Sequence, residues 1–228
     1  MVKSWSFSAL ENYEECPRQY QYRKIEKREE PQAPALAKGS LWHKACEFTL
    51  KGQTLNEGLA KAFGSFSGTA KEQVADLVAH NATPEQQIAL TQNLTVTSWF
   101  GRDAWLRAIL DAYYVDANKC AHVKDFKTGQ MRKVKQDQKV LSLFAAYRLL
   151  AASGVNATSF SFQFIPLEMD VVDPPYEVDL ATLKAEYRTI EERAKAGLLA
   201  ATEFKPKPGS HCKWCHFRAS NNGPCSEG

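Results

Sequence analysis

The stretch that decides the fold is residues 104–129, AWLRAILDAYYVDANKCAHVKDFKTG. Runs rich in apolar and aromatic residues flank the turn-forming segment Asp116–Lys119, which predicts two antiparallel strands joined by a short loop. In a strand, side chains two residues apart point to the same side, so Asp125 and Lys127 should share one face. Burying a carboxylate and an ammonium is costly unless they pair or hold a metal, and the alternative is an exposed ion pair at a strand end.

The register of this hairpin places a second carboxylate, that of Asp111, near Asp125. A loop centred near Asn118 places Asp111 opposite Asp125, because both residues lie equally far from the centre. Two carboxylates a few ångströms apart repel, so at neutral pH both stay ionised when a cation lies between them. Oxygen ligands of this kind suit Mg²⁺ or Mn²⁺.

Such a site predicts phosphodiester chemistry. A divalent ion polarises a phosphodiester and lowers the pKa of bound water. Lys127 could position or deprotonate the water and stabilise negative charge on phosphate. His43, in GSLWHKACE, is a candidate third ligand; Glu47 lies four residues later, on the same helix face.

The surrounding sequence predicts an α/β fold with a small mixed β-sheet flanked by helices. Periodicity indicates helices over 39–51 and over the stretch QKVLSLFAAYRLLAA, a half-buried strand in ATSFSFQFIPL, and a helix capped by Asp179. We expect a helical insert at 52–100, which offers no recognisable chemistry, and a Cys-rich tail at 203–228. The whole chain, 1–228, is interpreted as one domain.

Composition limits the class of protein. The 228 residues are 44% hydrophobic and 24% charged, as in an ordinary globular protein. There is no apolar run of about 18 residues, which predicts no membrane-spanning helix. The N-terminal residues lack the apolar core of a signal peptide, so we expect a cytoplasmic location and no membrane partner. A net charge of +3 permits nucleic-acid binding without arguing for it.

The cysteines indicate a second metal centre. Six occur, and Cys212, Cys215 and Cys225 lie close to the C-terminus. In a reducing cytosol a Cys-x2-Cys pair is typical of metal binding rather than of disulfides. His211 and His216 flank the pair, so zinc is an open alternative to iron.

The order of these motifs resembles the PD-(D/E)XK nuclease superfamily, and its RecB-like branch in particular. The matching residues are Gly39 to His43, then Asp111, then the run Asp125-Phe126-Lys127-Thr128-Gly129. The N-terminal SFSALENYEECPRQYQYR is similar to the opening helix of that branch. The resemblance implies a restriction-endonuclease-like fold, with metal ligands at His43, Asp111, Asp125 and the carbonyl of Phe126.

The same resemblance implies further assignments. The branch places a glutamine that contacts DNA on the next helix; here it is Gln138, with Ser142 where a tyrosine is usual. One group in the branch, which includes CRISPR-associated and AddB-type exonucleases, holds a [4Fe–4S] cluster through one early and three late cysteines. Cys16, Cys212, Cys215 and Cys225 match those positions.

The sequence thus predicts a Mg²⁺- or Mn²⁺-dependent DNA exonuclease. Cleavage in the 5′→3′ direction on single-stranded ends, and protein partners in recombination, repair or CRISPR adaptation, are what the resemblance implies. Tyr13, Tyr20 and Tyr22, interspersed with basic residues, either pack internally or grip a single strand. Two other readings stay open: a non-catalytic module that binds DNA or a partner on a nuclease fold, and a zinc-ribbon regulatory protein.

Overall fold

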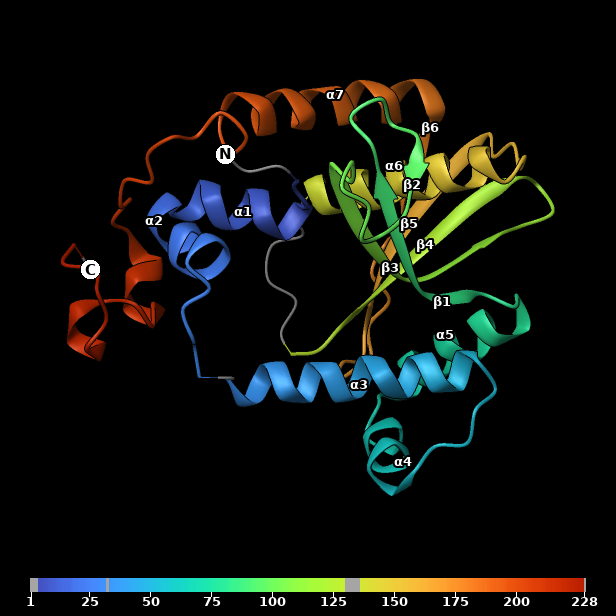
Figure 1. Ribbon diagram of the computed structural model, residues 1–228. Coiled ribbons are helices and arrows are strands. Elements are labelled where there is room, and N and C mark those ends of the chain that lie inside the picture. The colour runs from blue at the N-terminus through green and yellow to red at the C-terminus, as the bar shows by residue number, and fades with distance from the viewer. Residues whose placement is uncertain (1–3, 32, 130–135, 228) are drawn as a thin grey trace. The chain divides into compact units, whose positions relative to one another are not determined.

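A computed structural model describes residues 4–31, 33–129 and 136–227. The chain divides into two units. The larger is Gln32–Tyr187, and the smaller combines Met1–Pro31 with Arg188–Gly228. Figure 1 labels the helices and strands along the chain.

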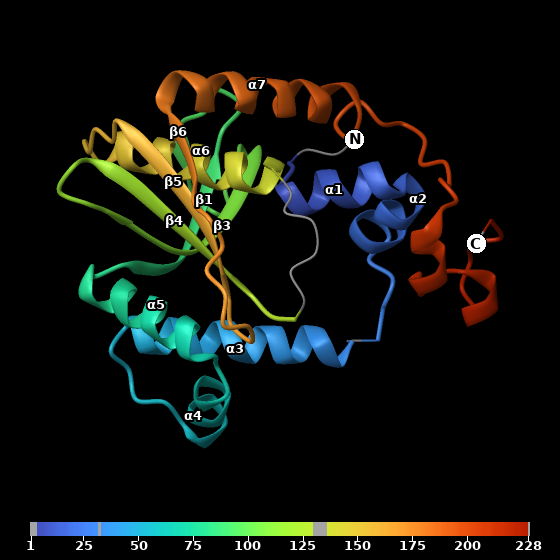
Figure 2. The ribbon, with the colours of Figure 1, turned by 180° about the vertical axis from the view of Figure 1, so that it is seen from behind.

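The larger unit is built on a mixed sheet, as the sequence predicted. Within the described residues it has six strands in the order β2-β1-β3-β4-β5-β6. β4 and β5 are parallel and all other neighbours are antiparallel, so helix α6 (Gln136–Ala152) serves as the crossover between them (Figure 2). The strands are β1 (Thr83–Leu90), β2 (Val96–Thr97), β3 (Leu106–Val115), β4 (Cys120–Lys127), β5 (Ser159–Pro166) and β6 (Tyr176–Asp179).

The β3–β4 hairpin has the predicted register. Tyr113 pairs with Val123, and Ala112 pairs with Lys124. The loop is held by Asp116, whose carboxylate accepts hydrogen bonds from the backbone N–H groups of Asn118 and Cys120, both at 2.9 Å. This Asx-type turn fixes the loop length and therefore the pairing of the residues that follow it.

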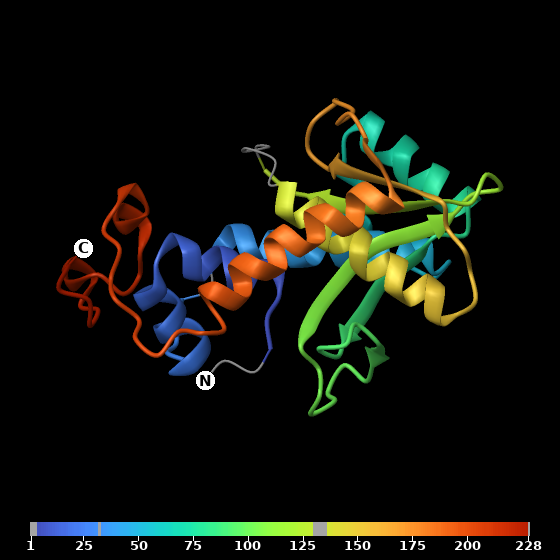
Figure 3. The same ribbon diagram turned by 90° about the horizontal axis from the view of Figure 1, so that it is seen from above.

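Helices cover both faces of the sheet. On one face α3 (Pro34–Leu50), α4 (Glu57–Gly64) and α5 (Gly68–Ala79) form an apolar cluster with Ala112, Phe126 and Ile165. α6 covers the other face, and Phe144 of α6 stacks on Tyr187 with ring centroids 3.6 Å apart. Figure 3 shows α7 (Leu180–Ala196) crossing α6. The predicted cap of α7 is confirmed, because Asp179 accepts a 2.8 Å hydrogen bond from Thr182 N–H.

The prediction that the insert at 52–100 is helical is wrong for its second half. Residues 83–97 form strands β1 and β2, joined through a turn in which Thr91 N–H donates to the Thr95 carbonyl at 2.8 Å. The run Pro84–Gln87 contains good helix formers, but pairing with β3 overrides their local preference. Because these residues form a strand, β1 pairs with β3 and lies beside Asp111.

Two further predictions need adjustment. β5 is buried on both faces rather than half-buried, since Ser161 and Gln163 are buried as well as the three phenylalanines. A strand lying inside a sheet that has helices on both sides is covered on both sides. α3 also begins earlier than predicted, at Pro34, a residue favoured in the first turn of a helix.

The smaller unit holds α1 (Phe7–Glu15), α2 (Pro17–Tyr20), the π-helix η1 (Gln21–Ile25), and the short 3₁₀ helices η2 (Ser210–Trp214) and η3 (Ala219–Asn221). Tyr20 and Tyr22 are 4% and 6% exposed, so their rings pack internally and are not available to grip a nucleic acid. Among the described residues, no helix is both long enough and apolar enough to span a membrane.

Candidate functional site

Asp125 and Lys127 lie on the same face of β4, as predicted, and they contact each other. The Lys127 ammonium lies 2.6 Å from Asp125 Oδ2. Gln138, in the first turns of α6, donates from Nε2 to Asp125 Oδ1 at 2.6 Å and accepts from Lys127 Nζ at 3.5 Å. The glutamine therefore holds the acid and the amine in a fixed relative position.

Asp111 approaches this pair from the neighbouring strand. Its Oδ2 accepts a 2.8 Å hydrogen bond from the backbone N–H of Phe126. A side chain thus takes the place of a backbone partner where β3 and β4 separate, and the carboxylate is held between the strands.

His43 reaches the same point from α3. Its Nδ1 lies 3.3 Å from Asp111 Oδ2. α3 can come this close because of Gly39, one turn earlier: a Cβ there would lie 3.2 Å from the Thr128 hydroxyl. The spacing between Gly39 and His43 thus has a physical role, since the glycine gives the helix access to the end of β4.

Glu85, which no sequence pattern had indicated, completes the group. Pro84 pairs with Ala112 and Gln86 pairs with Leu110, so Glu85 stands opposite Asp111. Ligand atoms of His43, Glu85 and Asp111 all lie within 4.8 Å of one another. Glu85 has a backbone φ of 49°, a left-handed conformation that is rare for a non-glycine residue and typical of functional sites.

The electrostatics of the site favour a bound cation. Burial, and then the charge of Asp111, raise the pKa of Glu85 to about 7. Burial and Asp111 raise the pKa of Asp125 to about 7 as well, although Lys127 lowers it. For His43, burial lowers the pKa, but the hydrogen bond and charge of Asp111 raise it overall. Clustered carboxylates that resist ionisation are stabilised in their charged form by a cation.

These residues open onto a cleft of about 670 Å³ in the larger unit. Its walls include His43, Glu85, Asp111, Phe126 and Lys127. Carboxylate oxygens with one imidazole, converging from three elements, suit Mn²⁺ or Mg²⁺. The donor set therefore fits the divalent ion that the sequence predicted.

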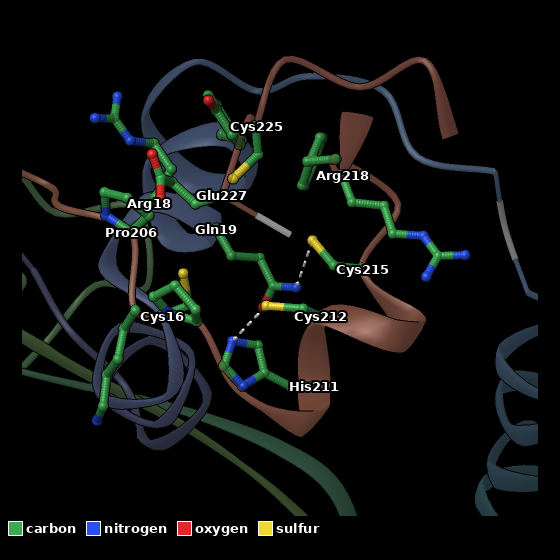
Figure 4. Close-up of a pocket in the computed structure, with 14 residues that line it drawn as sticks. Cys16, Arg18, Gln19, Pro206, His211, Cys212, Cys215, Arg218, Cys225 and Glu227 are labelled. Carbon is green, nitrogen blue, oxygen red and sulfur yellow. Dashed lines mark hydrogen bonds between the residues drawn. The ribbon is translucent and has the colours of Figure 1, made fainter. Parts of the chain in front are cut away.

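The four predicted cluster cysteines also converge, within the smaller unit. Figure 4 shows the sulfur atoms of Cys16, Cys212, Cys215 and Cys225 around a common space. The long spacing before Cys225 is absorbed by a fold-back, in which Cys225 N–H donates to the Phe217 carbonyl at 2.8 Å.

Backbone and side-chain amides point at two of these sulfurs. Gln19 donates from Nε2 to Cys215 Sγ at 3.4 Å, and the Gly209 N–H donates to Cys212 Sγ at 3.4 Å. Hydrogen bonds of this kind stabilise thiolates and tune bound clusters.

The four sulfurs do not form a tight group. Within the described part of the chain, no three of the four sulfurs lie within 4.8 Å of one another. Thiolates at about 2.3 Å from one zinc ion would lie about 3.8 Å apart. A [4Fe–4S] cluster binds each thiolate to a different iron and holds the sulfurs farther apart.

Comparison with known proteins agrees with this geometry. Residues 4–220 match the PD-(D/E)XK nuclease superfamily. A search of curated proteins found no match. Two crystal structures share the fold. SSO0001 has a TM-score of 0.50 at 18% identity over 100% of this chain and 88% of that one. A protein of Eubacterium rectale named "Putative exonuclease" has a TM-score of 0.52 at 14% identity, over 95% of this chain and 88% of that one.

Proposed function

The chain belongs to the PD-(D/E)XK nuclease superfamily, and from this premise we propose that it is a Mg²⁺- or Mn²⁺-dependent deoxyribonuclease. The observation that carries the proposal is the convergence of His43, Glu85 and Asp111 within 4.8 Å, beside the Asp125–Lys127 pair. A module that had lost catalysis would have no need to keep an amine against a buried carboxylate at such a site.

The residues have separate roles in this proposal. His43, Glu85, Asp111, Asp125 and the carbonyl of Phe126 hold the ion. When bound, Mg²⁺ or Mn²⁺ polarises the phosphodiester and lowers the pKa of water at the site.

Lys127 lies against Asp125 and stabilises charge that develops on the phosphate oxygens. Gln138 contacts both side chains and fixes their orientation. It therefore acts as a positioning residue, in addition to any contact with DNA.

We further propose that the enzyme is an exonuclease on single-stranded DNA ends, acting 5′→3′. Support comes from the motif order, which resembles the RecB-like branch, and from the shared fold with a protein named as an exonuclease. The superfamily match extends across both units, so we interpret them as parts of one nuclease domain.

We also propose that Cys16, Cys212, Cys215 and Cys225 bind a [4Fe–4S] cluster with a structural role. The wide spacing of the sulfurs and the amide donors to Cys212 and Cys215 support this assignment. Anaerobic purification followed by iron, sulfide and zinc analysis tests it. About four irons per chain are expected, whereas a colourless protein with one zinc ion would contradict the assignment.

The activity is tested with single-stranded DNA labelled at either end. In Mn²⁺, the wild-type protein should release short products from the 5′ end, and EDTA should stop the reaction. Asp111→Asn should be inactive. Products released from the 3′ end would overturn the 5′→3′ polarity. DNA left uncut in both Mg²⁺ and Mn²⁺ would overturn the enzymatic function and favour a DNA-binding module.

A further inference from the structure

The loop between β2 and β3 presents an exposed aromatic ring on a well-defined backbone. Phe100 is 87% exposed, although the loop around it is closed by its own hydrogen bonds. Gly101 N–H donates to the Ser98 carbonyl at 2.8 Å, and Thr97 donates to Asp103 at 2.9 Å. A single exposed ring is not by itself a binding site, so what surrounds Phe100 decides whether it binds a ligand.

Gly101 allows the tight turn that leaves the Phe100 ring exposed. A Cβ at Gly101 would lie 2.7 Å from Asp103 Oδ1 and 2.9 Å from the Ser98 carbonyl oxygen. No other residue would fit without a rearrangement of the backbone. The tight turn that follows Phe100 therefore depends on a glycine.

Arg107 ties this loop to one face of the sheet. Its Nε donates to the Trp99 carbonyl at 2.9 Å, and its guanidinium carbon lies 5.9 Å from the centre of the Trp99 ring. Along β3, Leu106 and Leu110 are buried, so Arg107 and Ile109 alternate with them and point to the opposite side.

That side leads directly to the candidate site. Ile109 is 45% exposed and lines the same cleft as Glu85 and Asp111. From Arg107 to Asp111 the strand advances by roughly 13 Å. A stacked single strand covers this distance in about four nucleotides, at about 3.4 Å per phosphate.

We propose that this loop is a stacking platform for single-stranded DNA, in which Phe100 stacks on an unpaired base while Arg107 contacts the backbone. The end of the strand then lies in the cleft at Asp111. Aromatic rings with nearby arginines bind single strands in this way without sequence preference. The inference rests on the proposed nuclease function and adds where the substrate runs and what holds it.

Single-stranded DNA is favoured as the ligand because the face of β3 that carries Arg107 and Ile109 leads into the cleft. A stacking surface for a protein partner would need no cation beside it and no exposed path to the metal ligands. Arg107, which also bonds the Trp99 carbonyl, adds a positive charge at this end of β3, and Ile109 extends the apolar surface toward Asp111.

The test is the affinity of the full-length protein for a fluorescent single strand of about 12 nucleotides, measured by anisotropy in EDTA. Phe100→Ala should raise the Kd about tenfold, which corresponds to about 1.4 kcal/mol. Phe100→Trp should keep or improve the affinity, because a larger ring stacks at least as well. Val172→Ala is the matched control, since Val172 is an apolar residue of the same unit that is 61% exposed and lies outside the cleft.

The outcomes separate this inference from the proposed function. A Kd unchanged by Phe100→Ala overturns the stacking platform, whether or not the wild type cleaves DNA, and assigns the ring to a different partner. A wild type that binds no single strand also overturns it. If Phe100→Ala weakens binding while the wild type fails to cleave in Mn²⁺, the platform stands and the enzymatic function falls.

Discussion

At the scale of single residues, Asp111 connects the parts of the site. Its carboxylate accepts from Phe126 N–H, lies 3.3 Å from His43 Nδ1 and stands opposite Glu85. Each of these contacts comes from a different element, so the position of one side chain depends on three elements being correctly placed. Its removal should therefore affect metal binding more than any change at the edge of the cleft.

Replacing Lys127 with methionine should separate catalysis from metal binding. The ammonium pairs with Asp125 and is not itself a metal ligand, so Lys127→Met should lower kcat about 10²–10⁴-fold. The Kd for Mn²⁺ should stay within a few fold of the wild-type value. Titration with Mn²⁺ and steady-state cleavage on the same preparation measure both quantities; an equal loss of metal affinity would contradict this division of roles.

Glu85 predicts a pH effect on stability in the metal-free protein. Its pKa is raised from 4.5 to about 7 in the folded state, so folding favours the protonated form. The stabilising contribution is complete below pH 4.5 and is lost as the pH rises through about 7.

Glu85→Gln cannot ionise and should keep that stability. In urea unfolding with EDTA, the variant should therefore be more stable than wild type at pH 8, and the two should match near pH 4. If wild type and Glu85→Gln were equally stable at both pH values, the pKa of Glu85 would not be raised by folding.

All five side chains predicted from sequence for the site lie together, but local structure explains the positions of only three of them. Asp125 and Lys127 share a strand face, and a short loop sets the register of Asp111. Glu85 was not found, since it joins the site through pairing of β1 with β3, which no local pattern in Pro84–Gln87 reveals. The role of Gln138 as a link between Asp125 and Lys127 likewise depends on how α6 packs.

At the scale of elements, the approach of α3 to the end of β4 decides whether His43 reaches Asp111. Gly39 sits at the contact with Thr128. The spacing between Gly39 and His43 could be read from the sequence, but the need for glycine follows from the short distance between α3 and the residue after β4, Thr128. Likewise, the residues of β1 were predicted to be helical because they form a strand only through pairing with β3. The hairpin and α6, in contrast, have strong local sequence patterns.

Gly39→Leu should push α3 away from β4 and displace His43. A displacement of about 1 Å can cost roughly a hundredfold in rate, so kcat should fall by that order. Gly64→Leu is the control, because nothing lies within 4 Å of a Cβ at Gly64 at the end of α4. Equal activity of the two variants would mean that close packing of α3 is not required.

At the scale of the whole molecule, the residues of the two proposed metal centres belong to different units. The divalent-ion ligands belong to Gln32–Tyr187, and all four cysteines belong to the smaller unit. The cysteine spacing in the sequence indicated a metal centre but left zinc and iron open. The fold-back at Cys225, where its N–H donates to the Phe217 carbonyl, accommodates the long spacing before the last cysteine.

Cys16→Ser should therefore remove iron and destabilise the smaller unit without abolishing metal binding in the larger one. Thermal unfolding followed by near-UV circular dichroism should show an early transition in the variant. Mn²⁺ affinity, measured below that transition, should stay close to that of the wild type. Loss of both centres together would show that the units do not fold as separate structures.

The measurement that tests the central claim most directly is Mn²⁺ binding followed by electron paramagnetic resonance of the unbound ion. The wild-type protein should bind Mn²⁺, and Asp111→Asn should weaken that binding at least about tenfold because it removes the shared ligand. A wild type that leaves all of the Mn²⁺ in solution, or an Asp111→Asn variant that binds it equally well, would contradict the account.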